Sequence, residues 1–310
     1  MKKSVALRVA AVAGALVVVE VAGALPARAA GLAPGDSGPR VRILQVRVAG
    51  WYPASVRKVH FALDGVYGAQ TVLAVRAFQR HHGLPVDGLA GPITLAAIAE
   101  LADRDTSTAH FNFSEFEQNY NPACSAQANA YAGTFRGGKV SARRVKRNIR
   151  RLMWRLEALR AKGRGNSIGI NSGFRSVAYN SCIGGAGLSQ HMYGTAADNR
   201  MANVSNHRER VLARRTELHG IGCYSSLTHN HLDMRMDNGD NPAARAWWWP
   251  EVDQRGRDLD SNGRVCWGEP KRRRSAVTSA GDAAESVVPT LAEIKAFAEA
   301  GEPRRLGAAD

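Results

Sequence analysis

The sequence predicts an α+β protein made of a small N-terminal helical bundle followed by an α+β domain with an antiparallel sheet. Three observations predict this class. Residues 32–101 contain an internal repeat with helical signals, a long amphipathic helix is indicated over 141–162, and apolar segments of strand length follow it. Helices that precede the strands, instead of alternating with them, are typical of α+β proteins.

The chain begins with the features of a secretory signal peptide. Basic side chains precede an apolar run over residues 9–25, and Ala27-Arg28-Ala29 supplies a cleavage site. Glu20 within the run argues against an uncleaved membrane anchor, because a carboxylate in the hydrocarbon core is costly. We therefore expect residues 1–30 to be a signal peptide, and the mature chain to be secreted or wall-located with no stable membrane insertion.

The net charge restricts the class of partner. The 310 residues carry a formal charge of +15, and residues 1–30 hold four basic side chains and one acidic one, so the mature chain is near +12. Such a charge indicates a polyanionic setting. No nucleic-acid recognition motif is present, so for an exported protein an anionic cell wall is favoured over nucleic acid.

The first unit, expected over residues 31–101, carries a repeat. Residues 64–71 and 87–94 share the pattern Asp-Gly-x-x-Gly-x-x-Thr. Each copy is interpreted as a glycine turn, a threonine that caps, and a short helix, the first running from Val72 to His82. With Gln45 and Phe78-Gln79, the segment resembles the small peptidoglycan-binding domain found on many wall hydrolases. The resemblance implies peptidoglycan binding, and a bundle that is only a spacer is the alternative.

A polar link is expected over 102–109, and a second domain over 110–270. Its first clear element is a helix from Ser141, the expected N-cap, to about Lys162. Apolar residues form one stripe along it at helical spacing: Val145, Ile149, Leu152, Leu156 and Leu159. Its arginines lie mainly off this stripe and are expected to form a solvated face.

Strands are expected over residues 167–171, 220–224 and 229–234, where short apolar runs occur. The aromatic run Trp247-Trp248-Trp249 could stack on sugars, but we favour a place in the core.

The segment Ser189–Asp198 (SQHMYGTAAD) and the later His229-Asn230-His231 offer candidate ligands for one metal. Imidazoles and a single carboxylate suit zinc, and three protein ligands leave the fourth position open to water. Gly194 allows a tight bend within the first segment. Residues two apart on a strand share a face, so one histidine of the pair can bind metal while the other transfers protons.

The form SxHxxGxAxD followed by HxH resembles the zinc D-alanyl-D-alanine carboxypeptidases and related peptidoglycan peptidases. The resemblance implies that His191, Asp198 and His231 bind Zn²⁺. It leaves His229 as the candidate proton-transfer group or stabiliser of the oxyanion. Ser189 is expected to orient the substrate or support the ligands.

A second motif, Ser172-Gly173-Phe174-Arg175, also resembles the family, where an arginine in this setting holds the substrate carboxylate. A planar guanidinium suits that task, because it pairs with a carboxylate through two hydrogen bonds. One departure is Ser226, which stands where some members carry a further histidine. The proton-transfer role therefore stays open between His229, His219 and Asp233.

The four cysteines are an even number in an exported chain, which indicates disulfides with three connectivities. A four-cysteine zinc site is the rival interpretation, but no Cys-x-x-Cys spacing supports it. The family resemblance suggests the pairs Cys124–Cys182 and Cys223–Cys266.

Residues 258–269 match the ligand positions of a calcium loop, with Asp258, Asp260, Asn262 and Glu269 as candidate Ca²⁺ ligands. The flanks do not indicate paired helices, and Asx turns alone would explain these residues. Both interpretations stay open. The stretch 271–310 opens with a basic run and is expected to be a mobile tail.

Together these features predict a secreted, monomeric, zinc-dependent peptidoglycan peptidase. A carboxylate-binding arginine favours a D-alanyl-D-alanine carboxypeptidase. An endopeptidase that cuts within the stem peptide or crossbridge is the alternative within the same class. A wall-binding protein that keeps zinc without turnover is the alternative from another class.

Overall fold

The computed structural model describes residues 31–53 and 60–237, with the short stretches 247–248, 257, 259–260 and 262–268. The expected signal peptide at 1–30 and the expected tail at 271–310 lie outside these residues. Within the described part, no helix combines the length and the apolar character needed to cross a bilayer.

The N-terminal unit is helical, as predicted. Its described elements are α1 (Pro39–Val48), the 3₁₀ turn η1 (Ala49–Trp51), α2 (Ala69–His81) and α3 (Pro92–Glu100). Helix α2 begins at Ala69, three residues before the predicted start at Val72, because Gly68 and not Thr71 is its N-cap.

A buried glutamine organises each copy of the repeat. The side-chain amide of Gln45 donates to Asp64 Oδ1 (2.8 Å) and to Thr71 Oγ1 (3.1 Å). Gln79 makes the equivalent bonds to Asp87 (2.7 Å) and Thr94 (2.9 Å). The expected capping role of the two threonines is wrong, since their hydroxyls point inward to these amides while Gly68 and Gly91 hold the cap positions.

The second domain is α+β, as predicted. Its sheet has the strand order β1-β2-β4-β3-β5, with β1 to β4 antiparallel and β5 parallel to β3. The strands are β1 (Ile168–Ser172), β2 (Ala196–Met201), β3 (Gly220–Cys223), β4 (Asn230–Asp233) and β5 (Trp247–Trp248). The helices and 3₁₀ turns are η3 (Phe113–Glu117), η4 (Pro122–Cys124), α4 (Ser125–Asn129), α5 (Ala142–Lys162), α6 (Val177–Cys182), η5 (Gln190–Tyr193), α7 (Asn206–Ala213) and η6 (Arg235–Asp237).

The interior strand β2 was not predicted. It reads Ala-Ala-Asp-Asn-Arg-Met, which lacks the β-branched and aromatic residues enriched in strands. Burial between β1 and β4 stabilises it instead. The side chains of the tryptophan run lie outside the described residues, and only the backbone of Trp247–Trp248 is placed, as the edge strand β5.

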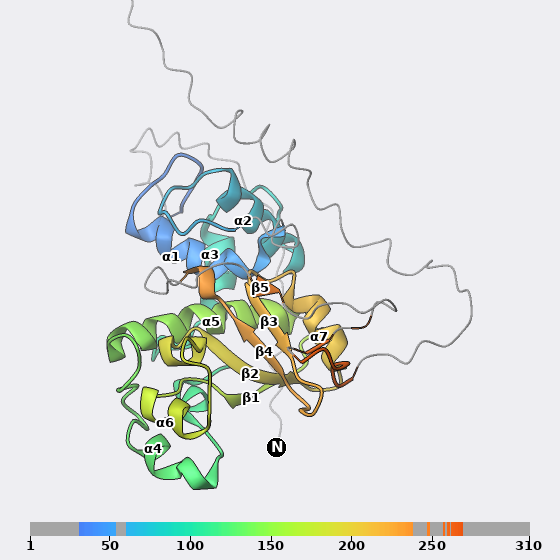
Figure 1. Ribbon diagram of the computed structural model, residues 1–310. Helices are drawn as coiled ribbons and strands as arrows, with labels where there is room; N and C mark the ends of the chain where they lie inside the picture. Colours follow the sequence, from blue (N-terminus) through green and yellow to red (C-terminus); the bar gives the residue numbers. More distant parts are fainter. Residues whose placement is uncertain are drawn as a thin grey trace, which may run out of the picture.

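Helix α5 confirms the prediction and adds a second buried face. Ser141 caps it through a bond from the Arg144 amide (3.4 Å), and the predicted apolar stripe lies in the core of the second domain. Trp154 and Ala158, on another side of the helix, belong to the N-terminal core. Figure 1 shows α5 between the N-terminal helices and the sheet. One helix therefore contributes to both hydrophobic cores.

Both predicted disulfides form. Cys124–Cys182 joins the start of α4 to the end of α6, and Cys223–Cys266 ties the end of β3 to the 262–268 stretch. The expected link at 102–109 folds back on itself, since Ala102 forms a bridge with Thr108.

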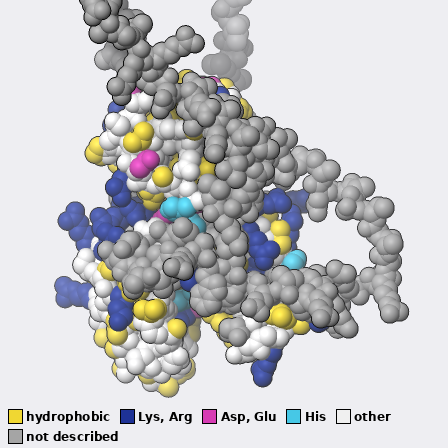
Figure 2. Space-filling view, turned by 45° about the horizontal axis from the view of Figure 1, so that its top comes forward, with side chains coloured by type: hydrophobic (Ala, Val, Ile, Leu, Met, Phe, Trp, Pro, Cys, Tyr) yellow, Lys and Arg dark blue, Asp and Glu magenta, His cyan; other side chains and the backbone are white. Residues whose placement is uncertain are grey.

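Basic side chains dominate the charged surface of the face shown in Figure 2. Helix α5 contributes exposed basic side chains, in agreement with the predicted solvated face: Arg143, Lys146 and Arg147. Arg155 on the same helix is fully buried, where it donates to Glu217 O (3.0 Å) and pairs with Asp237.

The close contact of η1 with α5 can be tested at Gly50. A Cβ atom there would lie 2.5 Å from Ala158 Cβ and 3.2 Å from Arg155 Cα. Gly50→Ala is therefore expected to lower the free energy of unfolding by about 1–3 kcal/mol, as overpacking does. Gly169→Ala is the matched control, because a Cβ on that exposed residue meets nothing within 4 Å. Equal denaturant midpoints for the two variants would contradict the close packing.

Candidate metal centre

The turn from η5 into β2 carries the first predicted motif. His191 lies in η5, and Gly194 ends that turn in the left-handed region with φ 69°. A non-glycine residue pays a steric cost there, and an added Cβ would also lie 2.9 Å from Val145. The bend predicted for Gly194 is thereby confirmed, and it directs the chain into β2 with Asp198 as the third residue of the strand.

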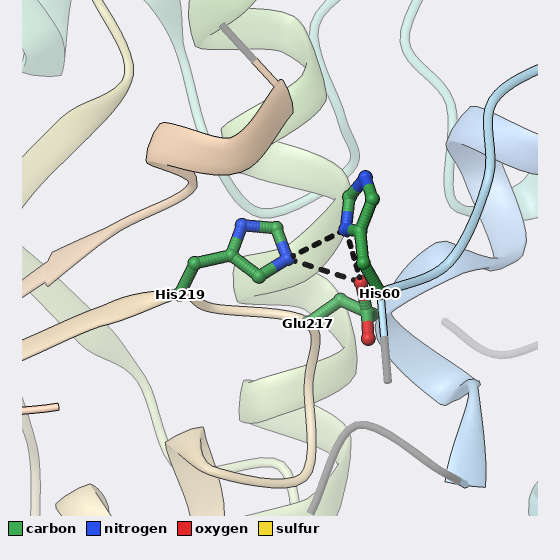
Figure 3. A group of neighbouring side chains, drawn as sticks. All are labelled: His60, Glu217 and His219. Carbon is green, nitrogen blue, oxygen red and sulfur yellow. Dashed lines mark hydrogen bonds and ion pairs between the residues drawn. The ribbon is translucent and has the colours of Figure 1, made fainter. Parts of the chain in front are cut away.

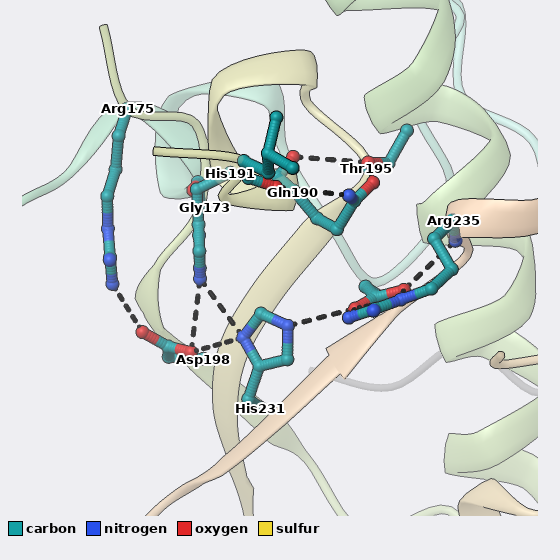
Figure 4. Close-up of polar contacts among 10 residues, drawn as sticks. Gly173, Arg175, Gln190, His191, Thr195, Asp198, His231 and Arg235 are labelled. Atoms are coloured by element: carbon teal, nitrogen blue, oxygen red, sulfur yellow. Dashed lines mark hydrogen bonds and ion pairs between the residues drawn. The ribbon is translucent and has the colours of Figure 1, made fainter. Parts of the chain in front are cut away.

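Strand register brings the later motif to the same place. Asp198 lies opposite His231 in the antiparallel β2–β4 pair, and side chains opposite each other are close neighbours in such a ladder. Asp198 Oδ1 is 3.0 Å from His231 Nδ1 and 3.2 Å from His191 Nε2. The two imidazole nitrogens are 3.1 Å apart, and all three side chains are buried (Figure 4).

These three atoms fit a zinc ion. Zinc–ligand bonds of about 2.0–2.1 Å with tetrahedral angles separate neighbouring ligand atoms by about 3.3–3.4 Å. The observed separations of 3.0–3.2 Å are close to that spacing. Two nitrogens and one carboxylate oxygen are also the donor set that zinc prefers.

Hydrogen bonds around the cluster orient both rings. His191 Nδ1 lies 2.6 Å from the carbonyl of Gly173, and His231 Nε2 lies 3.0 Å from Asp233 Oδ2. Arg235 in turn holds Asp233 through bonds of 2.5–3.1 Å. With the outward nitrogens protonated toward these acceptors, His191 Nε2 and His231 Nδ1 present lone pairs inward, as in metal sites with carboxylate-supported histidines.

The two groups that hold the ligand rings, the Gly173 carbonyl and the Asp233 carboxylate, each lie at or against a glycine that has no room for a Cβ atom. A Cβ on Gly173 would lie 2.5 Å from the backbone of Phe116, and one on Gly220 would lie 2.1 Å from the Asp233 carboxylate. Neither glycine was predicted from the sequence to have a role. The Ser-Gly-aromatic-Arg motif contained a signal for Gly173, whereas Gly220 is recognisable only from the strand pairing of Gly220 with Asp233.

Burial and charge set the protonation states of the cluster. Burial lowers the pKa of His191 to about 4, with the nearby Arg175 charge acting in the same direction. Burial alone would lower the pKa of His231, but hydrogen bonds to Asp198 and Asp233 outweigh it and raise that pKa to about 9. Although burial opposes it, contact with the two histidines holds the pKa of Asp198 well below its usual value. In the absence of a cation, His231 is therefore protonated on both ring nitrogens at neutral pH, whereas His191 is neutral.

Arg175 lies at the margin of the cluster. Its Nη2 donates to Asp198 Oδ2 (2.5 Å) and its Nε to Ser172 Oγ (2.9 Å), while its side chain is 15% exposed. The Asp198 carboxylate thus offers one oxygen to the two histidines and the other to Arg175. A guanidinium has five N–H donors, so these two bonds leave capacity for a second anion.

His229 precedes β4 by one residue and is half-buried. Burial lowers its pKa, with the Asp198 charge opposing, so its ring is neutral at pH 7. Its ring packs edge-on against Tyr224 with centroids 5.6 Å apart. Burial raises the pKa of the Tyr224 hydroxyl, and the Asp198 charge adds to the shift. Tyr224 therefore lies within electrostatic reach of the cluster. No signal in the sequence indicates this tyrosine, because a single tyrosine after a strand matches no motif.

The other predicted residues differ in how they relate to the cluster. Ser189 is the N-cap of η5 but makes no capping bond with its side chain. Ser226 is exposed. His219, considered for proton transfer, directs its ring to Glu217 and His60 and not to the cluster. Asp233 touches the cluster through His231.

The candidate calcium loop is described only in part, since Asp258 and Glu269 lie outside the described residues. The Asp260 carboxylate accepts backbone N–H bonds from Ser225 (3.2 Å), Asn262 (2.9 Å) and Arg264 (3.0 Å). These bonds form the Asx-type turn that was the alternative to calcium binding.

Both units of the chain are similar to known protein families. Residues 124–233 match the Peptidase M15 family, and residues 37–98 match a putative peptidoglycan binding domain. Over 167 residues the chain is 42% identical to the zinc D-Ala-D-Ala carboxypeptidase of Streptomyces albus G, which covers 54% of this chain and 60% of that enzyme.

Two further relatives match over shorter segments. The chain is 42% identical over 78 residues to a spore cortex-lytic enzyme of Bacillus cereus, covering 27% of it. It is 39% identical over 70 residues to an N-acetylmuramoyl-L-alanine amidase of Bacillus licheniformis, covering 19% of it. The chain thus spans less than two thirds of the length of each of these relatives. The two matches, residues 124–233 to the Peptidase M15 family and residues 37–98 to a putative peptidoglycan binding domain, agree with the resemblance seen in the sequence.

Proposed function

We propose that the chain is an exported, zinc-dependent D-alanyl-D-alanine carboxypeptidase that acts on peptidoglycan stem peptides. The observation that carries the proposal is the convergence of His191, Asp198 and His231 on one point, beside a partly exposed arginine. The similarity to the Streptomyces albus G enzyme supports the substrate class. The match of residues 37–98 supports attachment to peptidoglycan.

Each residue has a separate task in this proposal. A zinc ion held by His191, Asp198 and His231 would polarise the scissile carbonyl and acidify a water molecule. Arg175 would pair with the terminal carboxylate of the peptide, which places the last peptide bond at the ligand cluster. His229, neutral at pH 7, could hold a proton during bond cleavage. Asp233 and the Gly173 carbonyl would keep the ligand rings in place.

Two alternatives make different predictions. An endopeptidase would cut within the stem or crossbridge and need not meet a terminal carboxylate. A non-catalytic wall-binding protein would keep zinc but release nothing. The masses of the products from a defined stem pentapeptide separate them, since only a carboxypeptidase releases a single D-alanine.

The ligand assignment predicts the effect of His231→Gln. This change removes a ligand nitrogen while nearly keeping side-chain volume, so bound zinc and D-alanine release should both be lost with the native circular dichroism retained. His81→Gln, at the exposed end of α2, should alter neither. Full zinc content and activity in His231→Gln would overturn the assignment.

The protonation states predict how zinc affinity depends on pH. Ligand histidines must be neutral to bind a metal. Between pH 5 and 6.5, His191 is already neutral with a pKa of about 4, whereas His231 must lose a proton because its pKa is about 9. Affinity should therefore rise about tenfold per pH unit, the value for one released proton. Chelator competition measures this slope. A value near one hundredfold per unit would mean that both histidines bind protons in this range.

Replacement of Arg175 distinguishes a carboxypeptidase from an endopeptidase. Arg175→Ala should cost about 2–5 kcal/mol in kcat/KM on peptides with a free terminal carboxylate, as for truncated charged pairs elsewhere. The loss should be much smaller on the same peptide amidated, and lysine should rescue only partly because it lacks the guanidinium fork. Zinc content is measured in parallel, because Arg175 also contacts Asp198. Equal losses on both peptides would reject Arg175 as the carboxylate anchor.

A further inference from the structure

A second group of metal-ligand side chains lies between the two units. Within the described residues, two groups of three His, Asp or Glu side chains bring their ligand atoms within 4.8 Å of one another, and the second consists of His60, Glu217 and His219. His60 follows the N-terminal helix pair α1–η1 in the chain, whereas Glu217 and His219 immediately precede β3. Figure 3 shows the three side chains pointing toward one another across this junction.

The ligand atoms form a nearly equilateral triangle. His60 Nδ1 is 3.2 Å from His219 Nε2 and 3.3 Å from Glu217 Oε2, and His219 Nε2 is 3.1 Å from the same oxygen. These separations are close to the edge of about 3.3–3.4 Å expected around tetrahedral zinc. They also match the 3.0–3.2 Å of the first cluster. Two clusters in one chain thus share donor set and spacing.

The second cluster is accessible to solvent on one side, beside His60. The side chains of Glu217 and His219 are 1% and 7% exposed, whereas that of His60 is 29% exposed. An ion can therefore reach the cluster past His60, and a water molecule could complete a tetrahedral set from that side. Without a cation, Glu217 is a carboxylate buried between two imidazoles. A cation would stabilise this arrangement.

The surroundings hold the ligands in position. Glu217 Oε2 accepts the backbone N–H of Phe61 (3.0 Å), and His60 Nε2 lies 3.5 Å from Asp237 Oδ1. Glu217 has φ 53°, a left-handed conformation that a non-glycine residue adopts at a cost of about 1 kcal/mol or more. Such strained residues gather at ligand sites, and here the strain turns a buried carboxylate toward both histidines.

We propose that His60, Glu217 and His219 bind a second divalent transition-metal ion, with Zn²⁺ as the favoured occupant, which clamps the N-terminal unit to the peptidase domain. Two imidazoles and one carboxylate suit zinc better than calcium or magnesium, which take oxygen ligands. Because the ligands come from both units, the bound ion would cross-link them. The role is structural and does not depend on the first centre.

Metal content of the full chain tests the site. The protein is stripped with a chelator, loaded with Zn²⁺ and dialysed, and zinc per chain is measured by mass spectrometry. Wild type should hold two ions, and His60→Gln, His219→Gln and His191→Gln one each. The control is His110→Gln, since His110 pairs with buried Glu157 (2.9 Å) outside both three-residue groups and should leave two ions bound.

Stability provides a second readout. Zinc should raise the Tm of His191→Gln, which keeps only the second site, and should leave the Tm of the His60→Gln, His191→Gln double variant unchanged. His60→Gln alters a partly exposed side chain, so it keeps the test valid if His219→Gln fails to fold.

One zinc per chain in wild type, unchanged by His60→Gln, would overturn the proposal. So would a His191→Gln variant that holds no zinc. Loss of peptidase activity in His191→Gln with one zinc retained would leave it intact, so the two proposals fail separately.

Discussion

Asp198 and His231 face each other across the β2–β4 ladder, both buried, and the other polar groups of the centre are arranged around this pair. A buried carboxylate is costly unless charges and hydrogen bonds compensate it. Here His191 and His231 contact one oxygen and Arg175 the other. A one-residue slip of β4 would turn His231 to the opposite face of the sheet and remove both the ligand and the compensation. Strand register is therefore the constraint on which the candidate chemistry depends.

The turn before β3 connects this centre to the junction of the two units. The His219 amide donates to Asp233 O (2.7 Å), and the Asp233 side chain supports His231. Helix α5 spans the same region, with one face in the core of the second domain and Trp154 in the core of the N-terminal unit. The N-terminal unit is thus packed against the second domain through shared apolar surface, which favours a defined placement of the unit over a freely swinging one.

Sequence alone predicted the parts of the site that rest on local chemistry. The bend at Gly194 and the helix cap at Ser141 follow from residue type. The motif spacing and the family resemblance singled out His191, Asp198 and His231, which the fold brings together. Strand β2 was missed because its pairing partners, not its propensity, stabilise it. The threonine caps were wrong because buried glutamines compete for those hydroxyls. His60 and Glu217 are far apart in sequence and carry no motif, so only the packing of the two units brings them together.

The proposed function requires one zinc ion among His191 Nε2, an Asp198 oxygen and His231 Nδ1. An anomalous difference map from a crystal of the zinc-loaded protein, collected on both sides of the zinc absorption edge, tests it directly. We expect a peak about 2.0–2.2 Å from each of these three atoms. A map with no peak there, and with His191 and His231 still in contact with Asp198, would contradict it.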